Sequence, residues 1–173
     1  MPSTISYKDG DMKWGFQTPH SGEVLRAVKL LLDEGQGKSY DPASESKKII
    51  SKMNKDPVDI VGEYLQKIVS HSTQLLERRF GNTLSRMELK YVLTVPAVWS
   101  DKAKNSTLRA GISAGIPVSN VSLVSEPEAA ALHCLDSLTH TLKVRLKIKV
   151  NLQVFLASIN CTCGIERRCY PGL

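Results

Sequence analysis

The sequence lacks the long apolar run of a membrane helix, which needs about 20 consecutive apolar residues. Residues 1–7 also lack the basic cap and apolar block of a secretory signal peptide. These two absences argue against an integral membrane protein and a secreted protein. We therefore expect an intracellular protein that resides in the cytoplasm or the nucleus.

Cysteine is scarce, and most of it lies near the end of the chain. Of the four cysteines, Cys161, Cys163 and Cys169 fall within residues 142–173. The same stretch carries six basic residues and one acidic residue, a net charge of +5, whereas the other 141 residues carry 17 basic and 16 acidic residues. The body of the protein is therefore nearly neutral and has one thiol, which excludes a disulfide scaffold.

The basic stretch alternates apolar and polar residues from Leu142 to Val154, and the polar ones are cationic as far as Lys149; this period-two pattern predicts a strand. Its cationic face, Lys143–Lys149, could bind a phosphate or an anionic lipid, or it could keep an edge strand soluble. Because no aromatic residues are interleaved for base stacking, nucleic acid is not the expected partner. Three cysteines without two paired half-sites do not predict a structural zinc site.

The first half of the body reads as a hairpin followed by helices. Ile5–Phe16 alternates apolar and polar residues about an Asp-Gly turn, which predicts a β-hairpin. Apolar spacing predicts a short helix over Glu23–Asp33, and a Gly- and Ser-rich composition predicts a loop over Glu34–Ser46. A long amphipathic helix is predicted from Pro57 to Gly81.

The second half predicts a βαβ unit. Tyr91–Val95 and Val121–Val124 are short β-branched runs, and each is followed by a helix, one capped by Ser100 and one running from Glu126 to Leu135. Strand, helix, strand and helix in this order are typical of a parallel sheet. The predicted fold class is therefore α/β, with a mixed or parallel sheet and packed helices.

Glu126 is the strongest candidate for chemistry. It lies between a predicted buried strand and a helix start, at the carboxyl end of the sheet where α/β folds bind ligands. There its carboxylate could orient a water or hold a hydrated Mg²⁺ ion. The alternative is that Glu126 and Glu128 only stabilise the helix dipole, by about 0.3–1 kcal/mol each.

Two weaker candidates favour structural interpretations. Gly35–Ser39 ends like a phosphate-binding loop, but Leu32 occupies the position of the first glycine, and a helix rather than a strand is predicted before it. His133 beside Cys134 is interpreted as a packing residue, because no carboxylate is spaced to orient a Cys–His pair.

Several segments of the chain resemble the heat shock protein 70 family. The strongest are a Thr-Val-Pro-Ala stretch, an Ala-Gly helix end and a Ser-Glu-Pro-Glu-Ala-Ala-Ala stretch, in the family's order and at similar spacing. The Trp after Pro-Ala-Val and the Ser-Glu-Pro-Glu form are similar to a divergent branch that is abundant in filamentous fungi. These segments are Val92–Asp101, Ala110–Ile116 and Val124–Ala131, with weaker matches at Pro2–Tyr7, Trp14-Gly15 and Val24–Lys29.

The resemblance implies an actin-like (ribonuclease H-like) ATPase fold that binds ATP and Mg²⁺ between two lobes. It implies that Glu126 is the active-site glutamate near the metal and the attacking water, and that Lys29 is the catalytic lysine that contacts phosphate. Pro96 and Lys104 match residues that relay nucleotide state to a neighbouring domain. Unfolded protein clients and co-chaperones are the implied partners.

The resemblance covers roughly residues 2–143 and is incomplete. Neither of the family's glycine-rich phosphate loops, Gly-x-Asp-x-Gly-Thr-Thr and Asp-x-Gly-Gly-Gly-Thr, is present, so we expect impaired ATP binding and hydrolysis. We expect a truncated, partial domain over residues 1–144 and an unrelated tail over 145–173, such as an unspliced intron or a frameshift produces. The alternative function is a non-catalytic module that binds a protein or an anion.

Overall fold

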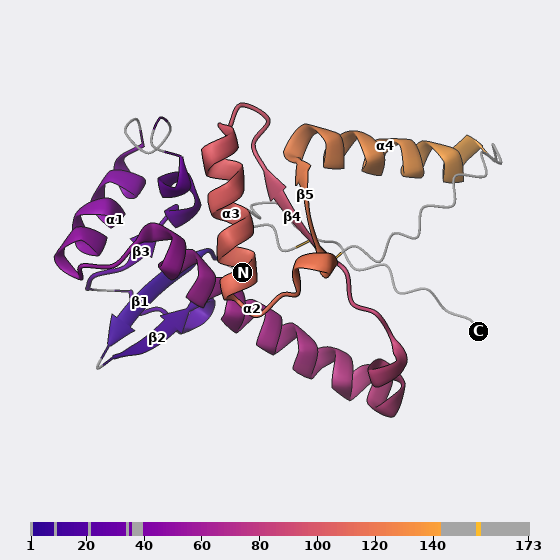
Figure 1. Ribbon diagram of the computed structural model, residues 1–173, viewed down its shortest axis with the longest axis horizontal. Helices are drawn as coiled ribbons and strands as arrows, with labels where there is room; N and C mark the ends of the chain where they lie inside the picture. Colours follow the sequence, from indigo (N-terminus) through magenta and orange to yellow (C-terminus); the bar gives the residue numbers. More distant parts are fainter. Residues whose placement is uncertain are drawn as a thin grey trace.

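Two small sheets lie on either side of the helices α2 (Pro57–Phe80) and α3 (Asp101–Ser113), as Figure 1 shows. The computed structural model describes residues 2–8, 10–20, 22–33, 35, 40–142 and 155–156. The architecture is mixed α/β, as predicted. Among the described residues, no helix combines the length and the apolar character that crossing a membrane requires.

The predicted hairpin is confirmed. Strands β1 (Thr4–Lys8) and β2 (Asp11–Trp14) pair antiparallel, with Ile5 opposite Trp14. Gly10 has a φ of +86° in the connecting turn, a conformation that glycine adopts without steric cost. A third strand, β3 (Leu25–Arg26), pairs antiparallel with β1, and the strand order is β2-β1-β3.

The prediction of a helix over Glu23–Asp33 is wrong. The segment contains β3 and then a short 3₁₀ helix, η2 (Val28–Leu32). Ala27, between them, has a φ of +53°, and this left-handed residue ends the strand and starts the tighter turn. The apolar residues themselves are buried as expected: Leu25, Val28 and Leu32.

The prediction of a loop over Glu34–Ser46 is wrong from residue 41 onward. Helix α1 (Asp41–Lys52) begins there with a proline in its first turn. The face that α1 buries is small and partly polar, and the Gly-, Ser- and Asp-rich composition before and at its start is typical of a loop, which hides the amphipathic pattern of the helix. Its buried residues are Ala43, Ser46 and Ile50.

The long helix is confirmed as α2. The side chain of Asp56 caps it by accepting a hydrogen bond from the backbone N–H of Val58 at 2.7 Å. Gly81 closes it with a φ of +53°, and a short 3₁₀ helix, η3 (Gly81–Arg86), follows.

The predicted βαβ unit is also confirmed. Strands β4 (Tyr91–Val95) and β5 (Val121–Ser125) pair in parallel, and α3 connects them with Ser100 as its cap. A short 3₁₀ helix, η4 (Val118–Asn120), precedes β5. The helix after β5, α4 (Glu126–Leu142), is seven residues longer than predicted, so Leu142 lies in a helix rather than at the start of a strand.

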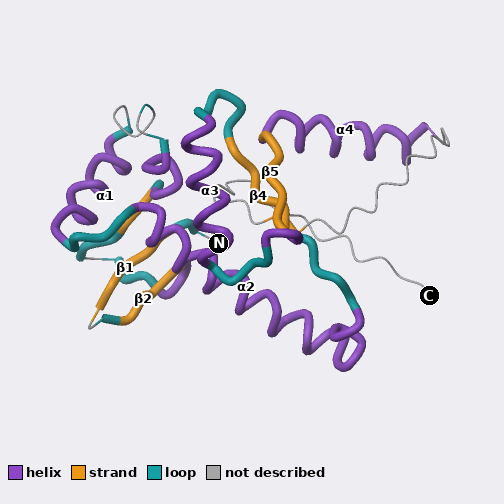
Figure 2. The backbone as a smooth tube through the Cα atoms, in the orientation of Figure 1, coloured by secondary structure: helices purple, strands orange, loops and turns teal. Residues whose placement is uncertain are grey.

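A two-residue strand, β6 (Phe155–Leu156), pairs in parallel with the start of β4, which gives the order β5-β4-β6. The predicted cationic face Lys143–Lys149 lies outside the described residues, as do Cys161, Cys163 and Cys169. Figure 2 shows α4 projecting from the rest of the molecule after β5.

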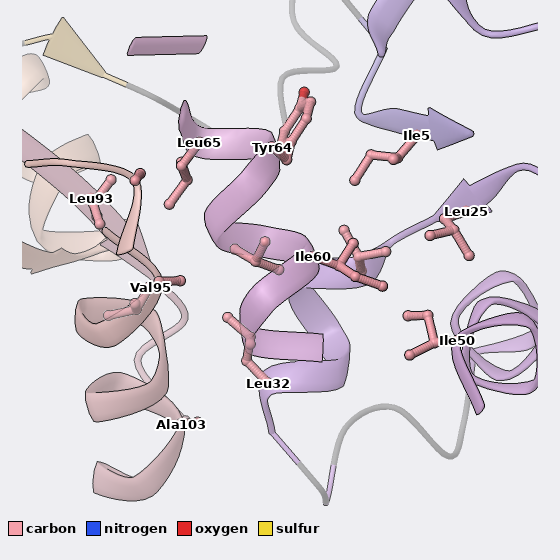
Figure 3. Close-up of a cluster of buried hydrophobic side chains, with 14 of the residues drawn as sticks. Ile5, Leu25, Leu32, Ile50, Ile60, Tyr64, Leu65, Leu93, Val95 and Ala103 are labelled. Atoms are coloured by element: carbon pink, nitrogen blue, oxygen red, sulfur yellow. The ribbon is translucent and has the colours of Figure 1, made fainter. Parts of the chain in front are cut away.

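One hydrophobic core joins the two sheets, and α2 runs through its centre. Ile60 of α2 is fully buried between the β1–β3 side and the β4–α3 side, as Figure 3 shows. On one side it faces Ile5 and Leu25, and on the other Val95 and Ala103. The two sheets therefore share a core rather than forming separate domains.

We expect Ile60→Ala to lower the free energy of unfolding by about 2–5 kcal/mol, because it removes apolar atoms and leaves a cavity in this shared core. Ile112→Ala, the same change at a position 39% exposed on α3, is the matched control and should cost less than about 1 kcal/mol. Urea unfolding followed by circular dichroism measures both. Equal losses for the two variants would contradict the central place of Ile60.

A polar cluster fastens the hairpin to α2. The Tyr7 hydroxyl donates to Glu63 Oε2 at 2.7 Å, Lys55 Nζ donates to Glu63 Oε1 at 2.7 Å, and Lys55 Nζ lies 4.4 Å from the centre of the Tyr7 ring. Burial, followed by the hydrogen bond and the negative charge of Glu63, raises the pKa of Tyr7 well above its ordinary value.

A raised pKa in the folded state means that Tyr7 contributes stability below the unfolded tyrosine pKa of about 10, and that this contribution declines as the pH rises above it. We therefore expect the free energy of unfolding to fall more steeply between about pH 10 and 12 in the wild type than in Tyr7→Phe. Urea midpoints measured across this range test it. Parallel curves for the two proteins would contradict the assignment.

Candidate functional site

The structure brings together Lys29 and Glu126, the two predicted catalytic residues, although they are 97 positions apart. Lys29 Nζ donates to Glu126 Oε1 at 2.6 Å. The Lys29 side chain is 1% exposed, whereas that of Glu126 is 43% exposed. The lysine of the pair is therefore buried, and the glutamate is partly exposed to solvent.

Glu126 is placed by the βαβ unit. It is the first residue of α4 and directly follows β5, so it stands at the carboxyl end of the parallel strands. Ser125 caps the helix, because its hydroxyl accepts a hydrogen bond from the backbone N–H of Glu128 at 3.3 Å. The Glu126 carboxylate therefore lies at a helix N-terminus and against the Lys29 ammonium.

Lys29 is placed by the turn that replaces the predicted helix. The left-handed residue Ala27 directs the chain into η2, which packs against α1, α2 and α3. This packing buries the Lys29 side chain among the helices. A lysine ammonium is seldom buried without an opposite charge, and Glu126 supplies it.

A third residue completes the site. The Lys29 ammonium lies 5.8 Å from the centre of the Trp99 ring, a cation–π distance. Trp99 is 3% exposed, and its indole nitrogen has no hydrogen-bond partner among the described residues. In the sequence, Trp99 contributes only to the family resemblance; the local pattern that points to it is an aromatic residue just beyond a buried strand.

The two predicted relay residues lie near the site in different ways. Pro96 follows β4, and its carbonyl accepts a hydrogen bond from the backbone N–H of Trp99 at 3.2 Å, so both residues share one turn. Lys104, in the first turns of α3, is partly exposed and its Nζ lies 3.2 Å from Asp101 Oδ1. It therefore pairs on its own helix rather than with Glu126.

The donors of the site suit an anion better than a bare metal ion. No group of three or more His, Cys, Asp or Glu side chains in the described part of the chain is placed to hold a metal. Glu126 supplies one carboxylate, which fits Mg²⁺ where phosphate oxygens and waters complete the coordination. In the described part of the chain, the site offers one carboxylate, and its Oε1 already accepts a hydrogen bond from Lys29.

The other candidates were the glycine-rich segment Gly35–Ser39 and the pair His133 and Cys134. Of the glycine-rich segment Gly35–Ser39, only Gly35 is among the described residues. His133 and Cys134 are exposed on α4, so the interpretation of His133 as a packing residue is wrong. The reason is that α4 contacts the sheet near its start and projects beyond it.

The chain is similar to bacterial chaperones. It is 28% identical over 140 residues to the chaperone protein DnaK of Mycoplasmopsis pulmonis (strain UAB CTIP), an alignment of 76% of this chain and 19% of that protein. It is 39% identical over 85 residues to chaperone protein HscA homologues of Actinobacillus pleuropneumoniae serotypes 5b and 3, covering 49% of this chain and 12% of each relative.

The chain thus shows partial homology to heat shock protein 70 chaperones. This agrees with the family resemblance of the motifs at the level of the family. No protein-family model matches the chain, and no solved structure matches it. The aligned region spans about a fifth or less of each chaperone, so the activity of a whole chaperone is a proposal for this chain.

The different burial of Lys29 and Glu126 predicts different costs for removing each charge. Glu126→Gln leaves a buried ammonium without its counter-ion, and we expect a loss of about 1–3 kcal/mol. Lys29→Met leaves a carboxylate that water reaches, so it should cost less. The double variant should cost less than the sum of the two.

Urea unfolding of the four proteins at neutral pH measures this cycle. Lys52→Met is the control, because the Lys52–Glu23 pair spans 3.4 Å with both side chains largely exposed and should contribute less than about 1 kcal/mol. Additive losses for Glu126 and Lys29 would show that the two charges do not depend on each other.

Proposed function

We propose that residues 1–144 form part of a heat shock protein 70-like, actin-type ATPase domain in which Lys29 and Glu126 are the catalytic pair. The observation that carries this proposal is the 2.6 Å contact between a buried lysine and a carboxylate at the carboxyl end of a parallel sheet. The partial similarity to DnaK and HscA supports it. Residues 145–173 lie outside the proposed domain.

Lys29 is suited to contact a phosphate. Glu126 Oε1 is the acceptor that the described residues offer to its ammonium, so further N–H bonds remain for ligand oxygens. In a water-excluded site such a charge interacts more strongly than in bulk solvent. ATP would supply the phosphoryl group and Mg²⁺ would neutralise part of its charge.

Glu126 is suited to act near the metal and the attacking water. Its Oε1 is held by Lys29, and its 43% exposure leaves the carboxylate accessible from solvent. A carboxylate fixed on one oxygen can accept a proton or hydrogen bond on the other, which is what orienting a water requires.

We propose that nucleotide binding is weak for this chain. The sequence carries neither of the glycine-rich phosphate loops of the family, and backbone amides of such loops cradle phosphates. Lys29 and Glu126 would then make the main contacts with the phosphates and the metal, and losing either one should have a large effect.

The relay, the partners and the location belong to the same proposal. Pro96 lies in the turn that contains Trp99, which supports a role in relaying the state of the site, and Lys104 would extend that relay along α3. Unfolded protein clients or co-chaperones are the proposed partners, and the cytoplasm is the proposed location. Trp99 and the Ser125-Glu126 sequence favour the divergent, fungal-type branch.

A non-catalytic binding module is the second candidate, and α4 favours it. Leu132 and Leu135 on this helix are 45% and 58% exposed. Among the described residues, the main contacts of α4 are with the strands β4 and β5. An exposed apolar helix face is typical of a protein contact. In this role the Lys29–Glu126 pair would only hold the fold together.

Calorimetric titration with Mg-ATP distinguishes the two candidates. We expect saturable heat for the wild type, and at least about ten-fold weaker binding, or 1.4 kcal/mol, for Lys29→Met and Glu126→Gln. Lys52→Met should bind like the wild type, because that exposed pair lies outside the site. Circular dichroism establishes that each variant is folded at the temperature of the titration.

Two results would contradict the ATPase proposal. No heat with the folded wild type at millimolar Mg-ATP would favour the non-catalytic module. Binding that is unchanged in both site variants would mean that the nucleotide binds elsewhere.

A further inference from the structure

The site around Lys29 has more hydrogen-bond donors than acceptors. An ammonium has three N–H bonds, and Glu126 Oε1 is the acceptor that the described residues give Lys29. The indole N–H of Trp99 is buried and has no partner among those residues. Leaving a buried donor unpaired costs about 1–3 kcal/mol, so this surplus needs an explanation.

Trp99 is itself held firmly. It lies in the turn after β4, where its backbone N–H donates to the Pro96 carbonyl at 3.2 Å, and its side chain is 3% exposed. The residue that follows, Ser100, caps α3 by accepting a hydrogen bond from the backbone N–H of Ala103 at 3.2 Å. The backbone on both sides of Trp99 is thus hydrogen-bonded, and its buried ring offers a surface to the ammonium.

We propose that Trp99 is a positioning residue for Lys29 and that its indole N–H is a further donor toward the ligand of the site. The ring holds the ammonium at 5.8 Å by a cation–π interaction and limits the directions in which its remaining N–H bonds point. An anionic ligand that reaches both groups would satisfy these N–H bonds and the indole N–H. The second part rests on the proposed function, which identifies that oxygen as a phosphate oxygen.

The positioning role is tested without any ligand. Protons over an aromatic face resonate upfield, so the ε-methylene protons of Lys29 should be shifted upfield in the proton–carbon spectrum of lysine-labelled protein. Lys29→Arg assigns the signal. The shift should persist in Trp99→Phe, which keeps a ring, and disappear in Trp99→Leu.

Lys55 is the internal control, because its ammonium lies over the Tyr7 ring and its signal should be the same in all Trp99 variants. The positioning role is overturned if the wild-type Lys29 signal is not shifted upfield, or if Trp99→Leu retains the shift. The wild-type spectrum decides the matter even where Trp99→Leu fails to fold.

The donor role is tested with Mg-ATP. The chain has two tryptophans, so its proton–nitrogen spectrum has two indole signals, and Trp99→Phe assigns them. We expect the Trp99 signal to move on titration while that of Trp14, which packs against Tyr64 and His71, stays in place. Trp99→Phe should weaken binding by about two- to ten-fold, the effect of one hydrogen bond.

The outcomes separate this inference from the proposed function. Calorimetric binding with no movement of the Trp99 signal overturns the donor role and leaves the ATPase proposal standing. Neither heat nor movement overturns the donor role and the ATPase proposal together, and the Lys29 shift then decides the positioning role alone. Equal movement of both indole signals also contradicts a specific donor.

Discussion

The burial of the Lys29 charge is the constraint on which the rest of the structure depends. An ammonium removed from water needs an opposite charge nearby, and Glu126 provides it from the far end of the described chain. Three helices must pack around η2 to bury the lysine, and the βαβ unit must be complete to present the glutamate. One contact thus requires both halves of the fold to be correctly assembled.

The parts of this arrangement that follow from local periodicity could be predicted from the sequence. The hairpin, the long helix and the βαβ unit all have a regular apolar pattern and a recognisable cap or turn, such as Asp56 before α2. Glu126 could be placed as well, because parallel strands bring their carboxyl ends to one edge. Its location follows from topology and needs no side-chain detail.

The parts that depend on tertiary packing could not be predicted in this way. The apolar spacing of Glu23–Asp33 fits a helix, but pairing of Leu25 with Ile5 and the left-handed Ala27 impose a strand and a 3₁₀ turn. Helix α1 is amphipathic, but it buries a small, partly polar face and begins within a segment of loop-like composition, which hides the pattern. Lys29 was identified by family resemblance alone, since no local pattern marks a lysine for burial.

The turn after β4 explains why the site and the proposed relay belong together. Pro96 and Trp99 are joined by a backbone hydrogen bond, and the Trp99 ring lies against the Lys29 ammonium. In the proposed relay, a ligand that draws the ammonium toward itself would change its contact with the indole, and the turn would carry that change to Pro96. Such coupling requires the ligand to bind one position of Lys29 more tightly than another. In this proposal the surplus of donors around Lys29 would provide that difference, because only the position aimed at the ligand would satisfy them.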